Sequence, residues 1–461
     1  MPVEMPSVGP PDAVRFPPVS REVLDNGLAV WVISDSAMGV VSAALVMPAG
    51  SADDPPERPG LVSLTADMLD EGAAGRDAIE LSEELGRLGS RLAIDVDPDV
   101  TAISIGTLDR RFSETLGLLA DVVLRPHFGA PDFDRVRELR GSRLRQLTQS
   151  AGTVAGRAFA TAVYGDHPYG HGTLGTTRAL ELMSVDEARS TWERASQPAG
   201  ATLVVAGGVT ADEVMRAVKG SGLDRWKAGK DVGSLFRTDA NRNRLPTSFP
   251  GRGTTPSVLL VDRPGAPQSE LRVGHLGPPR HTPDYHALVT LNAVLGGQFT
   301  SRLNRNLRET RGITYGARTA FDMHRVAGSF LCDTSVQSDA TAVAGREILN
   351  EFRAIREPGA VSAEELALAQ ASLTRGYVRH FETAAHFTRA LIELATYDLP
   401  AETFDRFVPA VTAVTPDDLA RAGQTALFPD ACAIVVVGDA AKCRGPLEES
   451  GLTVTAIEPE F

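Results

Sequence analysis

The chain has 461 residues, 43% of them hydrophobic and 23% charged, which is the composition of a soluble globular protein with more than one domain. No run approaches the roughly 18 consecutive apolar residues of a membrane span, so we expect no membrane contact. The net charge of −13 argues against a nucleic-acid partner, because phosphate binding needs clustered Lys and Arg.

The first residues, MPVEMPSVGPPDAVRFPP, are rich in proline and lack a basic segment followed by an apolar one. They do not resemble a signal peptide, so we expect a cytoplasmic protein, or a periplasmic one if a leader was removed before this numbering begins. The cysteines Cys332, Cys432 and Cys443 form no Cys-x-x-Cys pair. Neither a disulfide framework nor a thiolate metal site is predicted.

Apolar periodicity predicts strands and amphipathic helices along the first half of the chain. A helix that starts near Ser184 carries acidic residues in its first turn and leads into a buried strand that ends in glycine. The other elements expected here are strands at 28–33, 40–47 and 100–106, and helices that begin at 61, at 112 and near 132.

The second half repeats this order. A helix that starts near Thr415 leads into a buried strand whose Ile434 matches Leu203 of the first half, and Gly438 matches Gly207 at the same offset. The helix caps are read as one residue out of register. The other elements expected here are strands at 258–262 and 271–276, and helices that begin near 288, 342 and 362.

The order in each half is strands, helix, strands, helices, strand, without regular βαβ alternation. We therefore predict an α+β fold with two homologous halves, each an antiparallel sheet packed with helices. The stretch 227–257 is the least periodic and is rich in glycine, proline and charge. The predicted domains are 1–235 and 256–461, joined by a linker at 236–255.

Residues 291–321, LNAVLGGQFTSRLNRNLRETRGITYGARTAF, closely resemble the C-terminal signature of the pitrilysin/insulinase family. That family includes insulin-degrading enzyme and mitochondrial processing peptidase. The signature runs Leu-Gly-Gly, Ser-Arg-Leu, Leu-Arg-Glu and Tyr, found here at 295–297, 301–303, 307–309 and Tyr315. The segments LDNGLAVWV and GDHPYGHGTLGT extend the resemblance over nearly the whole chain. It implies a clamshell of two halves.

The resemblance also implies a zinc motif, His-x-x-Glu-His, on the first-half helix that follows a Gly-Leu pair. Two histidines one turn apart would hold zinc, and the glutamate would activate the bound water. Aligned on Gly60 and Met68, the two ligand positions hold Ser63 and Asp67, and the general-base position holds Ala66. We therefore expect no zinc in this chain.

A third zinc ligand, a glutamate on the helix after Phe133, is also missing from its expected place, because Glu138 lies early for the family spacing. Asp67, Asp70 and Glu71 cluster near a helix end, but such a group is typical of a solvated face. The nine histidines offer no ligand pair on one helix face and are interpreted as structural or surface residues.

Arg308 and Tyr315 are the candidate site residues of the second half. The resemblance implies that they face the zinc site from the opposite half, bind the substrate backbone and help to stabilise the oxyanion. A guanidinium and a phenol can both donate hydrogen bonds to a carbonyl that gains charge. The alternative interpretation is that Arg308 pairs on a helix face and that Tyr315 is a core aromatic.

Together these residues predict a non-catalytic, substrate-binding subunit of a heterodimeric zinc peptidase. A partner with His-x-x-Glu-His would supply the zinc and the general base, and the peptide would add as a β-strand. No cofactor is expected in this chain. The alternatives are a catalytically dead scaffold like the core subunits of the respiratory cytochrome complex, a peptidase with an unorthodox metal site, and a stand-alone peptide-binding homodimer.

Overall fold

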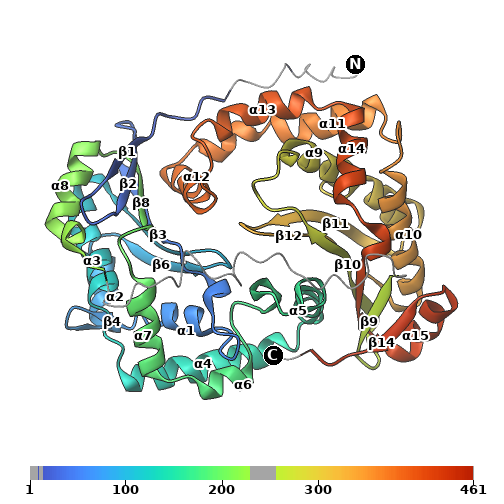
Figure 1. Cartoon of the computed structure of the whole chain (residues 1–461), viewed down its shortest axis with the longest axis horizontal. Helices are drawn as coiled ribbons and strands as arrows, with labels where there is room; N and C mark the ends of the chain where they lie inside the picture. The colour runs from blue at the N-terminus through green and yellow to red at the C-terminus, as the bar shows by residue number, and fades with distance from the viewer. Residues whose placement is uncertain (1–8, 10–13, 229–255, 460–461) are drawn as a thin grey trace, which may run out of the picture.

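The computed structural model describes residue 9, residues 14–228 and residues 256–459. Two six-stranded sheets lie in two halves of the molecule, each packed with helices (Figure 1). The linker predicted at 236–255 lies outside the described residues, so its boundaries stay a prediction. In the part of the chain that is described, no helix is long and apolar enough to cross a membrane.

The first sheet has the strand order β1-β2-β8-β3-β7-β6. Strand β3 is antiparallel to both β7 and β8, whereas β2 and β8 run parallel. Strand β6 forms one edge. The strands are β1 (Ser20–Val23), β2 (Ala29–Ser34), β3 (Val40–Met47), β6 (Arg91–Val96), β7 (Thr101–Leu108) and β8 (Thr202–Gly207).

The second sheet has the strand order β11-β12-β10-β13-β9-β14. Strand β10 is antiparallel to β12 and β13, whereas β9 runs parallel to β13 and β14. Strand β11 forms one edge. The strands are β9 (Ser257–Asp262), β10 (Gln268–Gly277), β11 (Thr314–Met323), β12 (Gly328–Gln337), β13 (Ala433–Gly438) and β14 (Thr453–Ala456).

Five of the six strands have the same order and directions in the two sheets, whereas β1 is antiparallel to β2 and β14 is parallel to β9. Counted from the edge inwards, β6, β7, β3, β8 and β2 match β11, β12, β10, β13 and β9, so the repeat in the sequence is also a repeat of the fold. Both sheets are mixed rather than purely antiparallel, which corrects part of the prediction. The reason is that β8 and β13 each follow a long helical connection, and such a connection allows a strand to return parallel to an earlier one.

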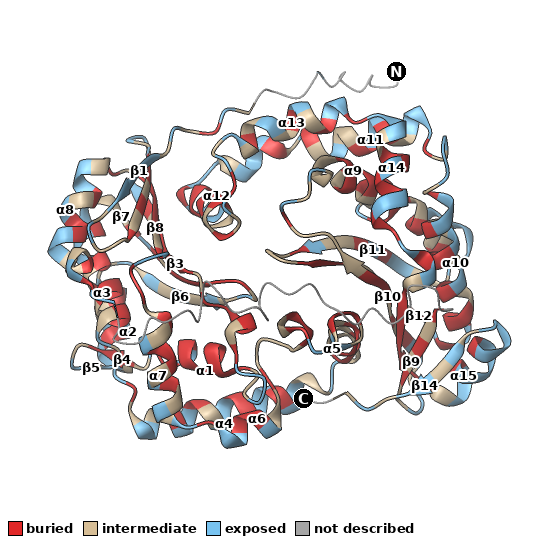
Figure 2. Cartoon of the chain, in the orientation of Figure 1, coloured by how far each residue is buried: buried red, intermediate tan, exposed pale blue. Residues whose placement is uncertain are grey.

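The helices of the first half are α1 (Leu61–Asp67), α2 (Ala78–Arg87), α3 (Phe112–Leu124), α4 (Ala130–Leu147), α5 (Ala151–Tyr164), α6 (Thr177–Leu182), α7 (Val185–Ala195) and α8 (Ala211–Ser221). Those of the second half are α9 (Tyr285–Leu295), α10 (Thr341–Ala354), α11 (Ala363–Thr374), α12 (Ala384–Thr396), α13 (Thr403–Ala413), α14 (Pro416–Ala426) and α15 (Ala440–Glu449). Their buried faces turn toward the sheets and their exposed faces outward (Figure 2).

The helices before the two repeated strands begin with equivalent caps. Ser184 accepts a hydrogen bond from the N–H of Glu187 at the start of α7, and Thr415 accepts one from Asp418 at the start of α14. Each carboxylate bonds back to the N–H of its cap, which completes a capping box. Both caps stand equally far before their strands, so the predicted one-residue difference is wrong.

One helix from each half packs against the sheet of the other half. Helix α5, from the first half of the sequence, buries Val154 and Phe159 in a cluster with Val435 of β13. Helix α12, from the second half, buries Leu391 in a cluster with Val204 of β8. Apolar burial therefore couples the two halves directly, at about 1.5–3 kcal/mol for each large side chain removed from water.

The hairpins at the two sheet edges also touch at their tips. Asp99, in the turn between β6 and β7, accepts hydrogen bonds from the Tyr169 hydroxyl (2.5 Å) and from the N–H of Arg325 (2.9 Å), in the turn between β11 and β12. The Arg325 guanidinium donates to the carbonyl of Thr396 at the end of α12 (2.6 Å). These contacts bring the ends of edge strands β6 and β11 together.

Candidate functional site

Helix α1 carries the positions where the sequence lacks a zinc motif. It starts at Gly60, whose φ of +94° favours glycine, and Asp54 accepts hydrogen bonds from the N–H groups of Gly60 (2.6 Å) and Val62 (2.7 Å). Burial raises the pKa of Asp54 to about 7, although these bonds oppose the shift. A Cβ on Gly60 would come within 2.7 Å of the Gly175 backbone, so the loop before α6 fixes the start of α1.

The guanidinium of Arg140, on α4, lies against the former metal positions. It donates hydrogen bonds to the Ser63 hydroxyl (2.9 Å), to the Asp67 carboxylate and to the Gly60 carbonyl (3.2 Å). The Arg140 side chain is 2% exposed, whereas that of Asp67 is 52% exposed. A buried guanidinium paired with a half-exposed carboxylate therefore stands where the family pattern would place a metal between two histidines.

These residues do not fit zinc. Structural and catalytic zinc sites use imidazole, thiolate and carboxylate ligands, and a guanidinium at the centre would repel a second cation. Ala66, which is 3% exposed, has only a methyl group where a general base needs a carboxylate. Across residues 14–228 and 256–459, no group of three or more His, Cys, Asp and Glu could hold a metal ion.

Arg140 is not among the residues predicted from the sequence, because the family pattern places a carboxylate on α4. Glu138 is exposed and faces away from the core, whereas Val136, Arg140 and Leu144 are buried at four-residue spacing. An arginine inside an otherwise apolar helical stripe was the available signal, since such a residue is rarely buried without a partner.

A cavity of about 310 Å³ lies beside Arg140 and reaches edge strand β6, which contributes Leu92 and Ile94 to its wall. The acidic residues predicted to form a solvated face border the same cavity. Asp67 and Asp70 are exposed, and Glu71 forms an ion pair with Arg135. The cavity is thus an apolar recess at the sheet edge with a charged rim.

Arg308 lies in the π-helical segment Asn304–Thr310. Its guanidinium stands 3.5 Å over the Phe299 ring, donates to the Phe299 carbonyl (3.2 Å) and pairs with Glu309 (2.7 Å). The Arg308 side chain is 16% exposed beneath a ring that is itself 74% exposed. The ion pair of the alternative interpretation therefore exists, and the guanidinium is held in one place at the surface.

Tyr315 is 92% exposed, so the interpretation as a core aromatic is wrong. It lies on edge strand β11, where the pairing register shifts between Thr314 and Ala317. Such a bulge re-aims side chains. Asn304 fixes the strand just beyond the bulge, because its side chain accepts from the Ala317 N–H (2.9 Å) and donates to the Ala317 carbonyl (3.0 Å).

Another signature residue, Arg302, is structural. It holds the Glu365 carboxylate through two hydrogen bonds, of 2.8 and 2.7 Å, and the two side chains are 14% and 16% exposed. These bonds lower the pKa of Glu365 to about 2. The signature therefore contains both buried supports and exposed residues.

The structure does not bring the predicted residues into one site. Among the contacts of the described residues, none joins Arg308 to Tyr315 or either of them to α1. The degenerate positions lie beside edge strand β6, and Arg308 and Tyr315 lie at or next to the equivalent edge strand, β11.

Two family models cover most of the chain. Residues 29–177 match the insulinase family (peptidase family M16), and residues 183–373 match the peptidase M16 inactive domain. The chain belongs to the M16 peptidase family. In this M16 protein, α1 holds Ser63, Ala66 and Asp67 where the zinc motif would have two histidines and a glutamate.

The curated relatives of this M16 protein include proteins named as uncharacterized zinc proteases. One from Mycobacterium leprae is 25% identical over 375 residues, which cover 80% of each chain, and one from Bacillus subtilis is 22% identical over 67% of this chain and 72% of its own length.

Solved structures share the whole fold. A protease from Helicobacter pylori matches with a TM-score of 0.82 at 17% identity, over 92% of this chain and all of that one. A peptidase M16 inactive domain from Pseudomonas fluorescens matches with a TM-score of 0.80 at 22% identity, over 91% and 98%. A chain of complex III from Candida albicans matches with a TM-score of 0.74 at 15% identity, over 95% and 100%.

Proposed function

We propose that this M16 protein is the substrate-binding subunit of a heterodimeric zinc peptidase. Arg308 and Tyr315 complete an active site whose zinc and general base come from a partner chain with His-x-x-Glu-His. The observation that carries this proposal is the exposure of Tyr315. A tyrosine that is 92% exposed on a bulged edge strand contributes little to the fold, so its presence calls for a role outside the chain.

The chemistry of the two side chains suits a carbonyl that becomes an oxyanion. The Arg308 guanidinium is already oriented by the ring and the carbonyl of Phe299, so little side-chain freedom is lost when it donates to a substrate. The phenol of Tyr315 has no hydrogen-bond partner among the described residues and is free to donate. Both donors act without a metal in this chain.

The sheet edges suit an extended peptide. Strands β6 and β11 each leave one row of backbone N–H and C=O groups unpaired by a neighbouring strand within the described sheets, and an added strand can pair with such a row. The cavity of about 310 Å³ beside β6 can take a peptide side chain next to Leu92 and Ile94. Broad backbone recognition with one side-chain recess is the binding mode that this surface supports.

The test uses the intact complex of this chain with a catalytic M16 partner. Arg308→Ala combined with Tyr315→Phe should leave assembly unchanged and lower turnover by the partner roughly a hundredfold, as the loss of transition-state donors does. Arg305→Ala is the matched control, because Arg305 is exposed in the same π-helical segment. Unchanged turnover in an intact complex would contradict the proposal and leave a scaffold role.

The isolated chain should hold no stoichiometric zinc and should cleave no peptide, because Ser63, Ala66 and Asp67 offer no zinc site and Arg140 neutralises the acid. Metal analysis after dialysis measures this directly. One tightly held zinc ion per chain would contradict the expectation that this chain has no zinc site.

A further inference from the structure

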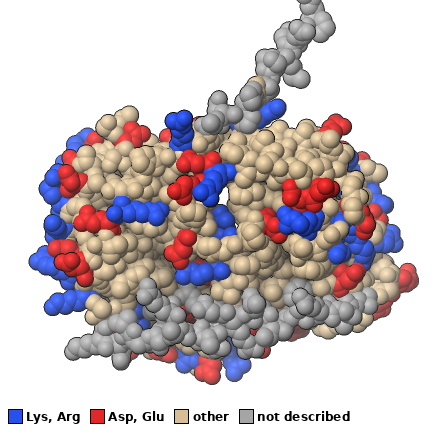
Figure 3. All heavy atoms as spheres, turned by 45° about the horizontal axis from the view of Figure 1, so that its top comes forward, with Lys and Arg blue, Asp and Glu red and all other residues tan. Residues whose placement is uncertain are grey.

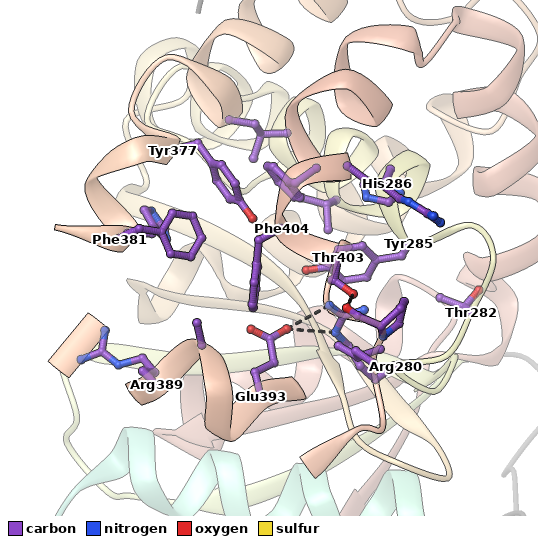
Figure 4. Close-up of a pocket in the computed structure, with 18 of the residues that line it drawn as sticks. Arg280, Thr282, Tyr285, His286, Tyr377, Phe381, Arg389, Glu393, Thr403 and Phe404 are labelled. Carbon is purple, nitrogen blue, oxygen red and sulfur yellow. Dashed lines mark hydrogen bonds and ion pairs between the residues drawn. The ribbon is translucent and has the colours of Figure 1, made fainter. Parts of the chain in front are cut away.

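A cavity of about 860 Å³ lies in the second half, and neither α1 nor the segment 299–315 contributes to its wall (Figure 4). Helices α9, α11, α12 and α13 and the 3₁₀ turn Tyr377–Phe381 line it, and it is open to solvent on one side. Its size is within the range of about 300–1,000 Å³ that is usual for small-molecule sites.

One wall of the cavity is aromatic and preformed. The rings of Tyr377 and Phe407 stack with centroids 4.2 Å apart, and Phe381 meets Phe404 at 5.3 Å. Phe16, from the N-terminal segment, packs behind this wall, 5.4 Å from Phe381 and 4.9 Å from Phe404. The rings are therefore braced from outside the cavity and present their free faces and edges to it.

The opposite wall carries a neutral ion pair. The Arg280 guanidinium lies 3.8 Å over the Tyr285 ring and donates to the Glu393 carboxylate at 2.9 Å. Figure 4 shows the Glu393 carboxylate between the Arg280 guanidinium and the ring of Phe404. Burial and the nearby Arg280 lower the pKa of His286, so this histidine adds no positive charge at neutral pH.

The rim of the cavity is cationic. Arg379, Arg389 and Arg406 are exposed there, and none of them pairs with a carboxylate in the described part of the chain. The chain as a whole has a net charge of −13, whereas these three arginines give the rim of the aromatic cavity a positive charge. On the face seen in Figure 3, acidic and basic side chains are interspersed. Aromatic walls with a cationic rim favour a ligand that has an apolar body and an acidic group.

We propose that this cavity binds a small amphipathic anion. Its apolar body lies against the rings of Tyr377, Phe381 and Phe404, and its acidic group contacts the rim arginines Arg389 and Arg406. The site is independent of peptide binding at the sheet edges, because none of its lining residues lies on β6 or β11.

The probes are 8-anilino-1-naphthalenesulfonate, whose fluorescence reports an apolar site, and decanoate as a competitor. Decanoate should displace the probe at one site per chain, and decylammonium, which has the same apolar length and the opposite charge, should not. The double substitution Arg389→Glu/Arg406→Glu should weaken both anions about tenfold or more, because charge-assisted contacts become repulsive. Ser372→Trp, which places an indole at an exposed lining position, should block both.

The matched control is Arg110→Glu/Arg178→Glu, which changes the net charge equally at exposed positions outside the cavity. It should leave both affinities within about twofold, because neither residue lines the cavity. All variants should keep the circular dichroism spectrum of the unaltered chain. Equal displacement by decylammonium, or anion affinities that neither cavity variant changes in folded protein, would overturn the proposal.

Discussion

The two edge sites of this protein occupy equivalent places in a duplicated fold but differ in how their side chains are used. Beside β6, Ser63 and Asp67 accept hydrogen bonds from Arg140, which is buried within the same half. Beside β11, Arg308 lies under an exposed ring, and Tyr315 projects into solvent. The first site pairs Ser63 and Asp67 within the chain, although the Nε of Arg140 has no hydrogen-bond partner among the described residues, whereas the second leaves the Tyr315 hydroxyl available as a donor.

This difference shows how a metal site can be lost without loss of the fold. Zinc would cross-link α1 to α4 through their side chains, and the Arg140 contacts make the same connection between the same helices. A guanidinium fits this role because its fixed fork of donors can serve several oxygen acceptors at once. Arg308 and Tyr315, beside β11, do not connect two helices in this way, so they are the residues to test for function.

The largest expected effect comes from rebuilding the metal site. Ser63→His, Ala66→Glu and Asp67→His together should bind no stoichiometric zinc, because Arg140 would still hold its charge at the centre. Adding Arg140→Glu should create a zinc site, whose binding energy is of the order of 10 kcal/mol in small metal-folded domains. Metal analysis after dialysis distinguishes the two variants, and zinc in the triple variant would show that Arg140 does not block the site.

Removal of Arg140 should be the most destabilising single change in this comparison. Arg140→Ala leaves Ser63 and the Gly60 carbonyl without their donor and should lower the free energy of unfolding by about 3 kcal/mol. Urea denaturation measures it. Arg137→Ala, on the same helix, removes a largely exposed ion pair to Asp134, a 3.5 Å hydrogen bond to the Met183 carbonyl and a contact with the Phe133 ring, and should cost less, about 1 kcal/mol. Equal losses would mean that the buried guanidinium of Arg140 contributes no more to stability than a surface arginine does.

The Arg302–Glu365 pair should show an intermediate and pH-dependent effect. Arg302→Met should cost about 2 kcal/mol near neutral pH, since two charge-assisted hydrogen bonds are lost. The pKa of Glu365 is lowered from 4.5 to about 2, so its stabilisation is complete above pH 4.5 and is lost as pH falls toward 2. Urea denaturation at pH 6 and pH 3 should show a smaller difference between variant and unaltered chain at pH 3. If this difference in the free energy of unfolding did not change with pH, the ion pair would not be its cause.

The smallest effect on stability is expected at the exposed site. Tyr315→Phe should change the free energy of unfolding by less than about 0.5 kcal/mol, because the hydroxyl has no partner among the described residues. Urea denaturation of Tyr315→Phe and of the unaltered chain measures this change. A loss as large as that of Arg302→Met would show that Tyr315 supports the fold, and would weaken the case for its role in a shared active site.

Several strands and helices can be predicted from the local sequence alone. The strand at 40–47 and the helix at 112–124 agree with β3 and α3 to the residue, because each has a strong apolar period and clear ends. Strand β6 was overlooked although Leu92, Ile94 and Val96 alternate with polar residues. Its importance follows from its place at the sheet edge, and pairing order is not a local property.

By itself, the sequence determined that the chain consists of two repeated halves, that helices begin near Ser184 and Thr415, and that His-x-x-Glu-His is absent, since these features are read from residues close together in the chain. Only the tertiary structure decided that α5 and α12 exchange halves, that Arg140 meets α1, and that Tyr315 is exposed. Those features arise from packing between segments tens to hundreds of residues apart. Periodicity shows which face of a helix is apolar, but only the assembled fold determines which neighbour that face contacts.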